Sequence, residues 1–402
     1  MVITRKEIIT IFLLSIFTIH ISFIPIAAET QPILPLGISL VVLFFLNKFY
    51  VQNRVSKDIL YSWLLVAILS IYFIIGKFGF GDGSIITYIK YIIGPLIYIA
   101  IRKSILNINY KYIIGIVGAF FTLYLLLQFD IFQNIHALLI SRSYNTFEIG
   151  RMSLLTPEPS YFAHFLILIL IYIDLSYKNK IISLKKYNLL RIIMLFIALN
   201  VKSDLVFCIV LLYFLSYYPS LKLNKKIFLL FIIGIILVAI INLDFGRLSL
   251  ILNTIWLLVV GNISLVDVFF IYETSGSTRI IVNYLALANI FDNPMGSGLG
   301  SFLETLQNAG TVFGNDLTSH EVLKSKTTDE AQTYFVNLVN DIGVFAFLML
   351  LIVFSNNKKA STGNEQRIKY FIWLSLIVLL LFQCQVSNPI PWILIAILKD
   401  LK

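Results

Sequence analysis

Charged residues are scarce in this sequence, and several motifs that mark enzyme classes are missing. Asp, Glu, Lys and Arg make up 13 % of the 402 residues, against about a quarter in soluble domains. No Asp-x-Asp pair for a metal-bound nucleotide sugar occurs, and no Lys-Ser/Thr follows the glycines of 296–300 to complete a phosphate loop. His320 has no second histidine at zinc-protease spacing, and no Gly-x-Ser-x-Gly elbow is present. We therefore expect chemistry without a metal or cofactor, on a substrate that carries its own leaving group.

Cysteine is also rare. The two residues, Cys208 and Cys384, both lie in apolar runs, which favours packing over a disulfide or a metal site. The N-terminus resembles a signal peptide, because Arg5 and Lys6 precede an apolar run that ends at Ala27-Ala28. This run is longer than a usual signal core and more apolar runs follow, so we interpret it as an uncleaved first span.

Long apolar runs fill most of the chain. Hydrophobic residues make up 59 % of the sequence, and runs of about 17–22 residues, long enough to cross a bilayer, recur along it. The expected fold class is an all-α polytopic membrane protein with about 11–12 transmembrane helices, the last of them short. The expected spans are 8–27, 33–50, 59–76, 85–101, 112–129, 160–177, 188–201, 205–218, 227–243, 332–354, 370–386 and 388–398.

Alternate connections between these spans are rich in lysine and arginine. The basic connections hold Lys48, Arg54 and Lys57; Arg102, Lys103 and Lys111; Lys178, Lys180, Lys185 and Lys186; Lys222, Lys225 and Lys226; and Lys358, Lys359, Arg367 and Lys369. The positive-inside rule places them and both termini in the cytoplasm. Most of the net charge of +10 is then a topology signal, and nucleic-acid binding is not expected. We expect a single integral membrane domain, 1–402, with a smaller outer loop at 130–159 and a large one at 244–331.

The large outer loop contains apolar segments of its own. Residues 248–260 and 266–272 are apolar, and 279–291 is expected to form a helix with an apolar stripe. The stripe consists of Ile280, Tyr284, Leu287 and Phe291. Such segments are typical of short amphipathic helices that lie on a bilayer. Asp292-Asn293-Pro294 is expected to end the last helix, and the glycines of 296–300 permit a tight turn.

A glutamate stands between two prolines where the smaller loop enters the next span. Thr156 is expected to cap a helix with Pro157 at its first position, which places Glu158 in the first turn. Glu158 then either complements the helix dipole or serves as a catalytic base facing an outer cavity. The two flanking prolines restrict its backbone and Arg151 is close in sequence, which suits a positioned catalytic group.

Two cations stand where they suit a phosphate. Lys202 opens the short outer turn 202–204, where it either pairs with the aspartate of that turn or contacts an anion. Ser277 or Thr278 is expected to cap the amphipathic helix and to place Arg279 in its first turn, where a cation opposes the helix dipole. A diphosphate bound by Arg279 and helix N–H groups would resolve that conflict, unless a nearby glutamate pairs with the arginine.

Acidic residues precede and enter a late span. Asp329 and Glu330 stand before it, where carboxylates ordinarily complement a helix dipole. Asp341 lies within it, at a cost of about 2.5–3.5 kcal/mol on an insertion scale, so we expect it to face polar partners in the bundle. The same question arises for Lys90, Asp174, His164 and His20, and a structural role is the commoner answer for such residues.

Together these motifs resemble the bacterial O-antigen polymerase and O-antigen ligase superfamily. The resemblance covers about 150–345 in order and spacing. It rests on Arg151 with Pro157–Ala163, on Lys202-Ser203, on Thr278-Arg279 with Asn293–Gly298, and on Tyr334–Gly343. It implies a GT-C-like, metal-independent glycosyltransferase in the bacterial inner membrane, with its active site and both long loops facing the periplasm. The implied donor is an undecaprenyl-diphosphate-linked oligosaccharide, and a flippase and a chain-length regulator are implied partners.

The resemblance also implies roles for particular residues. Arginines of the outer loops bind the diphosphate in this family. The expected substrate contacts here are Arg151, Lys202, Arg279, Arg142 and Arg247. Arg279 and Glu158 are the expected catalytic residues, with Asp329 or Glu330 as the alternative base. The family often has arginine where Lys202 stands. Ligases commonly carry a histidine just before the position of Tyr334, and Ala331-Gln332 stands there instead, which favours a polymerase.

Other functions fit parts of the pattern. An O-antigen ligase and a capsule or exopolysaccharide polymerase share most of it. A lipid-linked glycan flippase or another transporter would have a similar number of spans and could couple ions through Lys90, Asp174 and Asp341. Flippases, however, are usually built from repeated halves with polar residues inside the spans. Here the polar residues concentrate in two unequal outer loops, which favours an enzyme.

Overall fold

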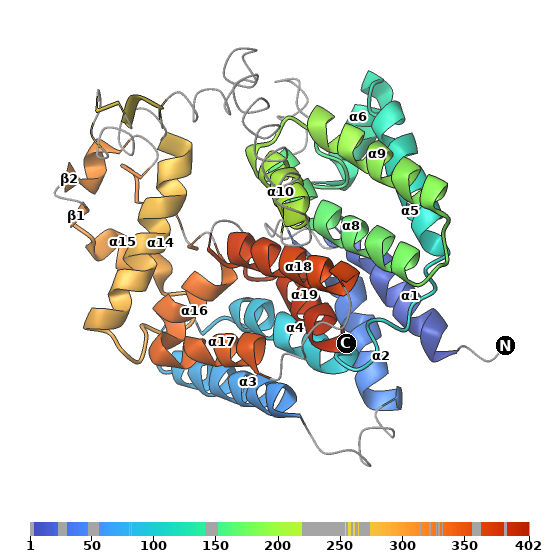
Figure 1. Cartoon of the computed structure of the whole chain (residues 1–402). Coiled ribbons are helices and arrows are strands. Elements are labelled where there is room, and N and C mark those ends of the chain that lie inside the picture. Colours follow the sequence, from blue (N-terminus) through green and yellow to red (C-terminus); the bar gives the residue numbers. More distant parts are fainter. Residues whose placement is uncertain are drawn as a thin grey trace.

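The described part of the chain is mostly helical in the computed structural model, with one short β-hairpin (Figure 1). The structure describes residues 4–22, 30–46, 56–79, 81, 83–140, 152–218, 254, 256–258, 260–261, 264, 274–312, 315–320, 323–326, 328, 330–331, 333–355, 363–381 and 384–401.

The helices before the large loop are α1 (Arg5–Ile16), α2 (Ile33–Leu46), α3 (Lys57–Gly76), α4 (Ile85–Ile101), α5 (Tyr112–Leu126), α6 (Asp130–Leu139), η2 (Pro159–Tyr161), α8 (Phe162–Lys178), α9 (Leu184–Asn200) and α10 (Asp204–Leu215). The later elements are α14 (Thr274–Asp292), α15 (Phe302–Asn308), β1 (Thr311–Val312), β2 (Asn315–Asp316), η5 (Leu317–Ser319), α16 (Tyr334–Ile342), η6 (Gly343–Ala346), α17 (Phe347–Phe354), α18 (Gly363–Leu381) and α19 (Ile390–Asp400). The two strands pair antiparallel.

The long helices run between two chemically different ends of the bundle. At one end Arg102, just after α4, places its Nε 2.7 Å from Asp58 Oδ2 at the start of α3. At the same end Arg367 of α18 places Nη2 2.6 Å from Asp174 Oδ1 near the end of α8. We name this end of the bundle the basic end. The opposite end carries α14 to η5, and we name it the loop end.

Several helices have the length and hydropathy of membrane spans. Among the described residues three helices qualify: Lys57–Gly76, Pro159–Lys178 and Tyr334–Phe354. A fourth span is α5 with α6 if the pair, bent by 119°, crosses as one broken segment. The chain is therefore a largely helical protein with three to four candidate membrane-spanning helices.

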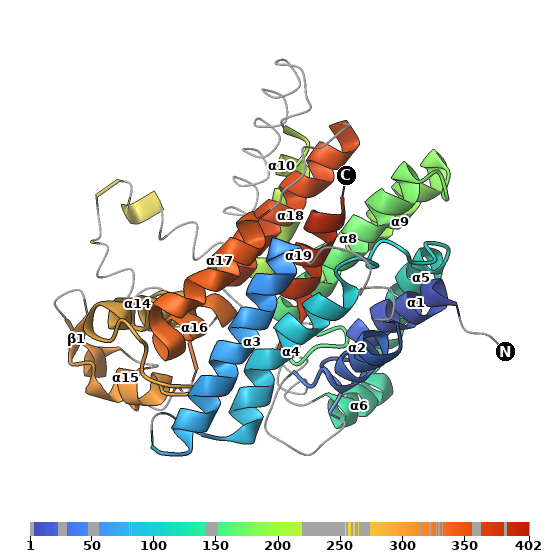
Figure 2. The ribbon, with the colours of Figure 1, turned by 90° about the horizontal axis from the view of Figure 1, so that it is seen from below.

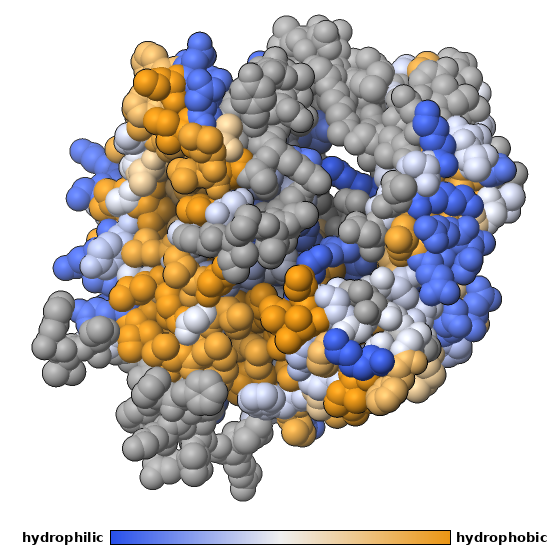
Figure 3. All heavy atoms as spheres, turned by 180° about the vertical axis from the view of Figure 1, so that it is seen from behind, coloured by the Kyte–Doolittle hydropathy of each residue, from blue (hydrophilic) through white to orange (hydrophobic). Residues whose placement is uncertain are grey.

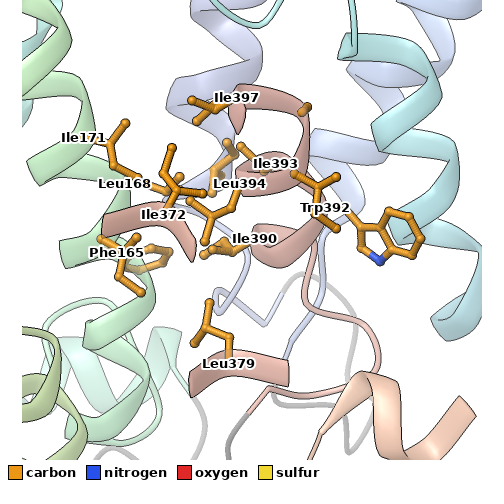
Figure 4. Packing of buried hydrophobic residues seen from close by; sticks show 14 of the residues in the cluster. Phe165, Leu168, Ile171, Ile372, Leu379, Ile390, Trp392, Ile393, Leu394 and Ile397 are labelled. Atoms are coloured by element: carbon orange, nitrogen blue, oxygen red, sulfur yellow. The ribbon is translucent and has the colours of Figure 1, made fainter. Parts of the chain in front are cut away.

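The centre of the bundle is built around α19. Every residue of Ile390–Lys399 is buried, and α19 packs against α4 and α18. Figure 4 shows Phe165 and Leu168 of α8 and Ile372 of α18 directed toward the isoleucines and leucines of α19. An all-round apolar helix of this kind is typical of a position inside a bundle.

The loop end has a second hydrophobic cluster. It joins one face of α14 to α15, the hairpin and α16 through Ile281, Val282, Ala286, Phe302, Leu306, Val312, Leu317, Leu323, Ala331 and Val336. The predicted stripe lies on another face of α14 and is exposed: Ile280 40 %, Tyr284 46 %, Leu287 37 % and Phe291 87 %. The loop therefore buries one face of α14 while leaving an apolar stripe outside, which is the pattern expected of an amphipathic surface helix.

Some predicted boundaries were wrong. The helix of the large loop begins at Thr274 rather than at Ser277 or Thr278, so Arg279 lies beyond the first turn and away from its unbonded N–H groups. In the smaller loop the helix begins at Pro159 and not Pro157, because the Thr156 hydroxyl donates to the Glu158 carbonyl oxygen at 2.8 Å and holds a turn.

Two further elements differ from the expected pattern. The first helix ends at Ile16, short of the predicted span 8–27. The smaller loop, expected at 130–159, starts with the helix α6. The expected span 227–243 and the apolar segment 266–272 lie outside the described residues.

Candidate functional site

The glycine-rich turn after α14 is fastened to the end of α16. Ser297 N–H donates to Asn340 O at 3.0 Å, and Gly298 N–H donates to Asp341 O at 2.9 Å. In return Val344 N–H donates to Pro294 O at 2.9 Å. Two of the sequence motifs, 293–300 and 334–343, therefore form one unit at the loop end.

Asp341 is the hub of this unit. Its side chain is fully buried and accepts hydrogen bonds from Gly300 N–H at 2.7 Å, from Asn340 Nδ2 at 2.8 Å and from the Tyr91 hydroxyl of α4. The Ser301 hydroxyl lies 3.4 Å away. A buried carboxylate needs such donors, so the prediction that Asp341 faces polar partners is confirmed.

Glu330 contacts α4, the helix that also carries Tyr91. It precedes α16 rather than beginning it, and it forms an ion pair with Lys90 of α4, the neighbour of Tyr91. Both side chains keep about a third of their surface exposed, 27 % for Lys90 and 32 % for Glu330.

Glu158 is positioned by η2 at the loop end of α8. It stands at the N-cap of η2, but its side chain makes no capping hydrogen bond. The carboxylate is half-buried, and the Ser160 hydroxyl lies 3.4 Å from Oε2. The carboxylate therefore stands at the N-terminus of η2 and accepts from a residue of that helix, an arrangement that fits both the dipole interpretation and the catalytic one.

The end of α18 and the connection to α19 contact one residue near Glu158 and one residue near Arg279 in sequence. Gln385 Nε2 donates to the Tyr161 hydroxyl at 3.0 Å, three residues after Glu158. On the other side Asn283 Nδ2 of α14 donates to Leu381 O at the end of α18 at 2.9 Å. Asn283 and Arg279 are four residues apart and share a helix face, so the face of α14 that carries Arg279 adjoins this connection.

Further polar contacts hold the same connection. Asn388 Nδ2 and His164 Nδ1 are 2.9 Å apart, Thr30 donates to Gln385 Oε1, and Thr333 pairs with Cys384 in a β-bridge. Sequence reasoning assigned no role to Gln385, Asn388 or Thr30. The sequence did carry a signal for these contacts, because Gln385, Ser387 and Asn388 interrupt two apolar runs.

The two predicted cations occupy different places. Arg279 is half-buried on α14, which packs against α15 and α16. Lys202 is exposed, with φ of 52°, in the turn before α10, and α10 packs against η2. Figures 1 and 2 place α14 on one flank of α16 and α18, and α8 and α9 on the other. Lys202 thus adjoins the Glu158 segment, and Arg279 approaches from the opposite flank.

Four predicted residues lie outside the described part of the chain: Arg142, Arg151, Arg247 and Asp329. His320 is described and buried, and its Nδ1 accepts Leu323 N–H at 3.3 Å, which gives it a role within the loop. Nearby, Asp316 accepts Thr318 N–H at 2.8 Å, and this bond lowers the pKa of the Asp316 carboxyl.

Buried polar residues elsewhere also have partners. Asp174 accepts the hydroxyls of Tyr187 and Tyr213, each at 2.9 Å, besides its contact with Arg367. Arg191 stacks on the Tyr187 and Tyr213 rings at 4.9 and 5.1 Å. This cluster stands at the basic end, away from the site, and its contacts match a structural role.

The two cysteines are free thiols, as predicted. Within the described ranges no group of three or more His, Cys, Asp or Glu side chains is placed to hold a metal ion. Comparison with known proteins finds no matching family model, no similar curated protein and no similar solved structure.

Proposed function

We propose that this chain is an O-antigen polymerase: a metal-independent glycosyltransferase that joins undecaprenyl-diphosphate-linked oligosaccharide repeat units. In this proposal it crosses the bacterial inner membrane about twelve times in a GT-C-like arrangement, and the loop end faces the periplasm. An O-antigen ligase and a capsule or exopolysaccharide polymerase are the nearest alternatives.

The observation that carries the proposal is the meeting of separate motifs at the α18–α19 connection. Gln385 contacts Tyr161 beside Glu158, and Leu381 contacts Asn283 on the Arg279 face of α14. The segments that carry Glu158 and Arg279, more than a hundred residues apart in sequence, thus each contact the end of α18 or the connection after it. A transferase that acts on a lipid-linked diphosphate needs a base and a cation at a membrane surface.

Each group has a task in the transfer. The acceptor hydroxyl attacks the anomeric carbon of the donor glycan, the bond from that carbon to the diphosphate oxygen breaks, and lipid diphosphate leaves. Arg279, with Lys202, would neutralise the charge that grows on the diphosphate, at about 1.5–3 kcal/mol for each charge-assisted contact. Glu158 would take the proton of the acceptor hydroxyl, a role that typically contributes about 10²–10⁴-fold in rate. Glu330, paired with Lys90, is the alternative base.

The charged residues predicted within spans have partners inside the protein, which fits a structural role. The three residues that an ion-coupled carrier would use already have partners inside the protein: Lys90 with Glu330, Asp174 with Arg367, and Asp341 with Tyr91. These contacts tie neighbouring helices together.

A deletion strain of the source organism tests the proposal. One repeat unit on the lipid core of the deletion strain is the expected result for a polymerase, whereas no repeat unit indicates a ligase or a flippase. Purified protein should then polymerise undecaprenyl-diphosphate repeat units in excess chelator. Activity that is lost in chelator and restored by magnesium or manganese would contradict metal independence.

A further inference from the structure

A cleft of about 540 Å³ opens at the loop end, between α14, α15 and the turn that joins α3 to α4. Its polar lining includes Asn289, Asp292, Asn293, Glu304, Thr305 and Asn308. Small-molecule sites in proteins have volumes of about 300–1,000 Å³, so the cleft is large enough for a few sugar rings. Figure 3 shows hydrophilic residues gathered along the edge on which Figure 1 places α15 and the hairpin.

The chemistry of the lining selects among ligands. Ligand sites are usually mostly apolar with a few polar groups, but here amides, hydroxyls and two carboxylates predominate. No lysine or arginine is among the described residues that line the cleft. Asp292 and Glu304 add negative charge and would repel a phosphate. Towards sugar hydroxyls, by contrast, amides both donate and accept hydrogen bonds and carboxylates accept them. The cleft therefore suits uncharged sugars or amino sugars.

The polar groups on the wall are held in place before any ligand arrives. Asn289 Nδ2 donates to Ser297 Oγ at 2.9 Å and lies 3.1 Å from Asn340 Oδ1. Asn293 Nδ2 donates to Asn289 Oδ1 at 2.8 Å, and the Thr305 hydroxyl donates to Asn340 Oδ1 at 3.0 Å. Side chains fixed in this way lose little freedom on binding, which favours affinity.

The cleft and Arg279 use different parts of the same helix. Arg279 and Asp292 are 13 residues apart in α14, a rise of about 20 Å. Arg279 shares its face with Asn283, which contacts α18. The cleft is lined by Ala288, Asn289 and Asp292, which lie on another face of the helix. A ligand in the cleft therefore does not occupy the position expected for a diphosphate.

We propose that this cleft is a carbohydrate-binding site for uncharged sugar units of a glycan, separate from the phosphate contact at Arg279. The identification of that glycan as substrate rests on the proposed function, but the recognition of sugar hydroxyls rests on the cleft alone. The site would hold glycan at a distance from the reacting diphosphate and so favour long products.

Binding by the full-length protein in nanodiscs tests the site. The probes are phosphate-free oligosaccharides of one and two repeat units, released by mild acid from the surface polysaccharide of the source organism, and inorganic diphosphate. The Asp292→Ala/Asn308→Ala double variant should weaken oligosaccharide binding by at least about tenfold, equivalent to about 1.4 kcal/mol, and leave diphosphate binding unchanged. Arg279→Ala should weaken diphosphate binding and leave oligosaccharide binding unchanged. Gln307→Ala, an exposed neighbour on α15 that does not line the cleft, is the matched control and should change neither.

The outcomes separate the two proposals. Wild-type protein that polymerises repeat units but binds no free oligosaccharide would overturn the carbohydrate site alone, as would equal binding by the double variant and wild type. The polymerase function alone would be overturned if the purified protein binds oligosaccharide through the cleft while the strain that lacks its gene makes glycan of unchanged length. Protein that neither binds nor polymerises would overturn both.

Discussion

Gly300 donates its backbone N–H to the buried carboxylate of Asp341, with an N···O distance of 2.7 Å. The two residues belong to motifs that are 41 residues apart and that the sequence alone could not join. Because Gly298 N–H bonds the Asp341 carbonyl as well, the turn is held to α16 through both the main chain and the side chain of one residue. The following predictions start from this unit.

Gly296→Ala and Gly343→Ala should each destabilise the protein by about 1–3 kcal/mol, the usual cost of backbone strain at a special conformation. Gly296 has φ of 80° and Gly343 of 56°, and an added Cβ would overlap Asp341 O and Pro294 O, respectively. Gly310→Ala is the control, since nothing lies within 4 Å of its added Cβ. Thermal unfolding in detergent measures the effect, and equal melting of Gly343→Ala and Gly310→Ala would contradict it.

Tyr91→Phe and Asp341→Asn should show coupled effects on stability. The Tyr91 hydroxyl donates to Asp341 Oδ2, and both side chains are buried. Residues in direct contact typically couple by about 0.5–3 kcal/mol in a double-mutant cycle. Tyr370→Phe, a partly exposed tyrosine, should be near neutral. Purely additive effects of the two changes would show that the contact contributes nothing.

Arg279→Ala should abolish long-chain glycan while leaving the amount of protein in the membrane unchanged. Arg279→Lys should recover little activity, because lysine lacks the planar fork that binds a diphosphate at two points. Lys324→Ala, an exposed lysine of the same loop, should make normal glycan. Gel analysis of surface glycan with immunoblotting of membranes gives the result, and normal polymer from Arg279→Ala would remove the residue from the site.

Glu158→Gln should lower the polymerisation rate by about 10²–10⁴-fold if the carboxylate is the base, with donor binding retained. If Glu158 only complements a helix dipole, the change costs about 0.3–1 kcal/mol of stability and chain length stays normal. Glu7→Gln, at the far end of the bundle in the Thr4 capping box, is the control for loss of a carboxylate. Near-normal chains from Glu158→Gln at normal expression would move the search to Glu330.

Reporter fusions test the orientation. Alkaline phosphatase fused after Asn315, in the hairpin of the large loop, should be active, because the loop end is predicted to face the periplasm. A fusion after Asn357, in a lysine-containing connection, should be inactive. An inactive fusion after Asn315 together with an active fusion after Asn357 would show that the predicted orientation is inverted and that the site faces the cytoplasm.

Hydropathy predicted much of the helical fold, and contacts across the chain account for what it missed. Apolar run lengths located most helices because a bilayer sets the length of a span, and the cost of burying Asp341 predicted its polar surroundings. The start of α14 was missed because Ser277 and Thr278 resemble caps, yet the helix begins at Thr274. The contact of Gln385 with Tyr161 spans 224 residues, and no local pattern encodes such a pairing.

Because α19 is buried and is translated late, the core of the bundle is completed only near the end of synthesis. The helix fills the space between α4, α8 and α18, and Lys399 near its end donates to the carbonyl oxygen of Val353 at 2.8 Å. Residues 102–389 must be translated between α4 and α19, which takes about 15–60 s at about 5–20 residues per second. Throughout that interval the space between α4, α8 and α18 stays unfilled. A stop codon before residue 390 would leave the surfaces that pack on α19 exposed, which makes this nascent bundle a natural target for membrane quality control.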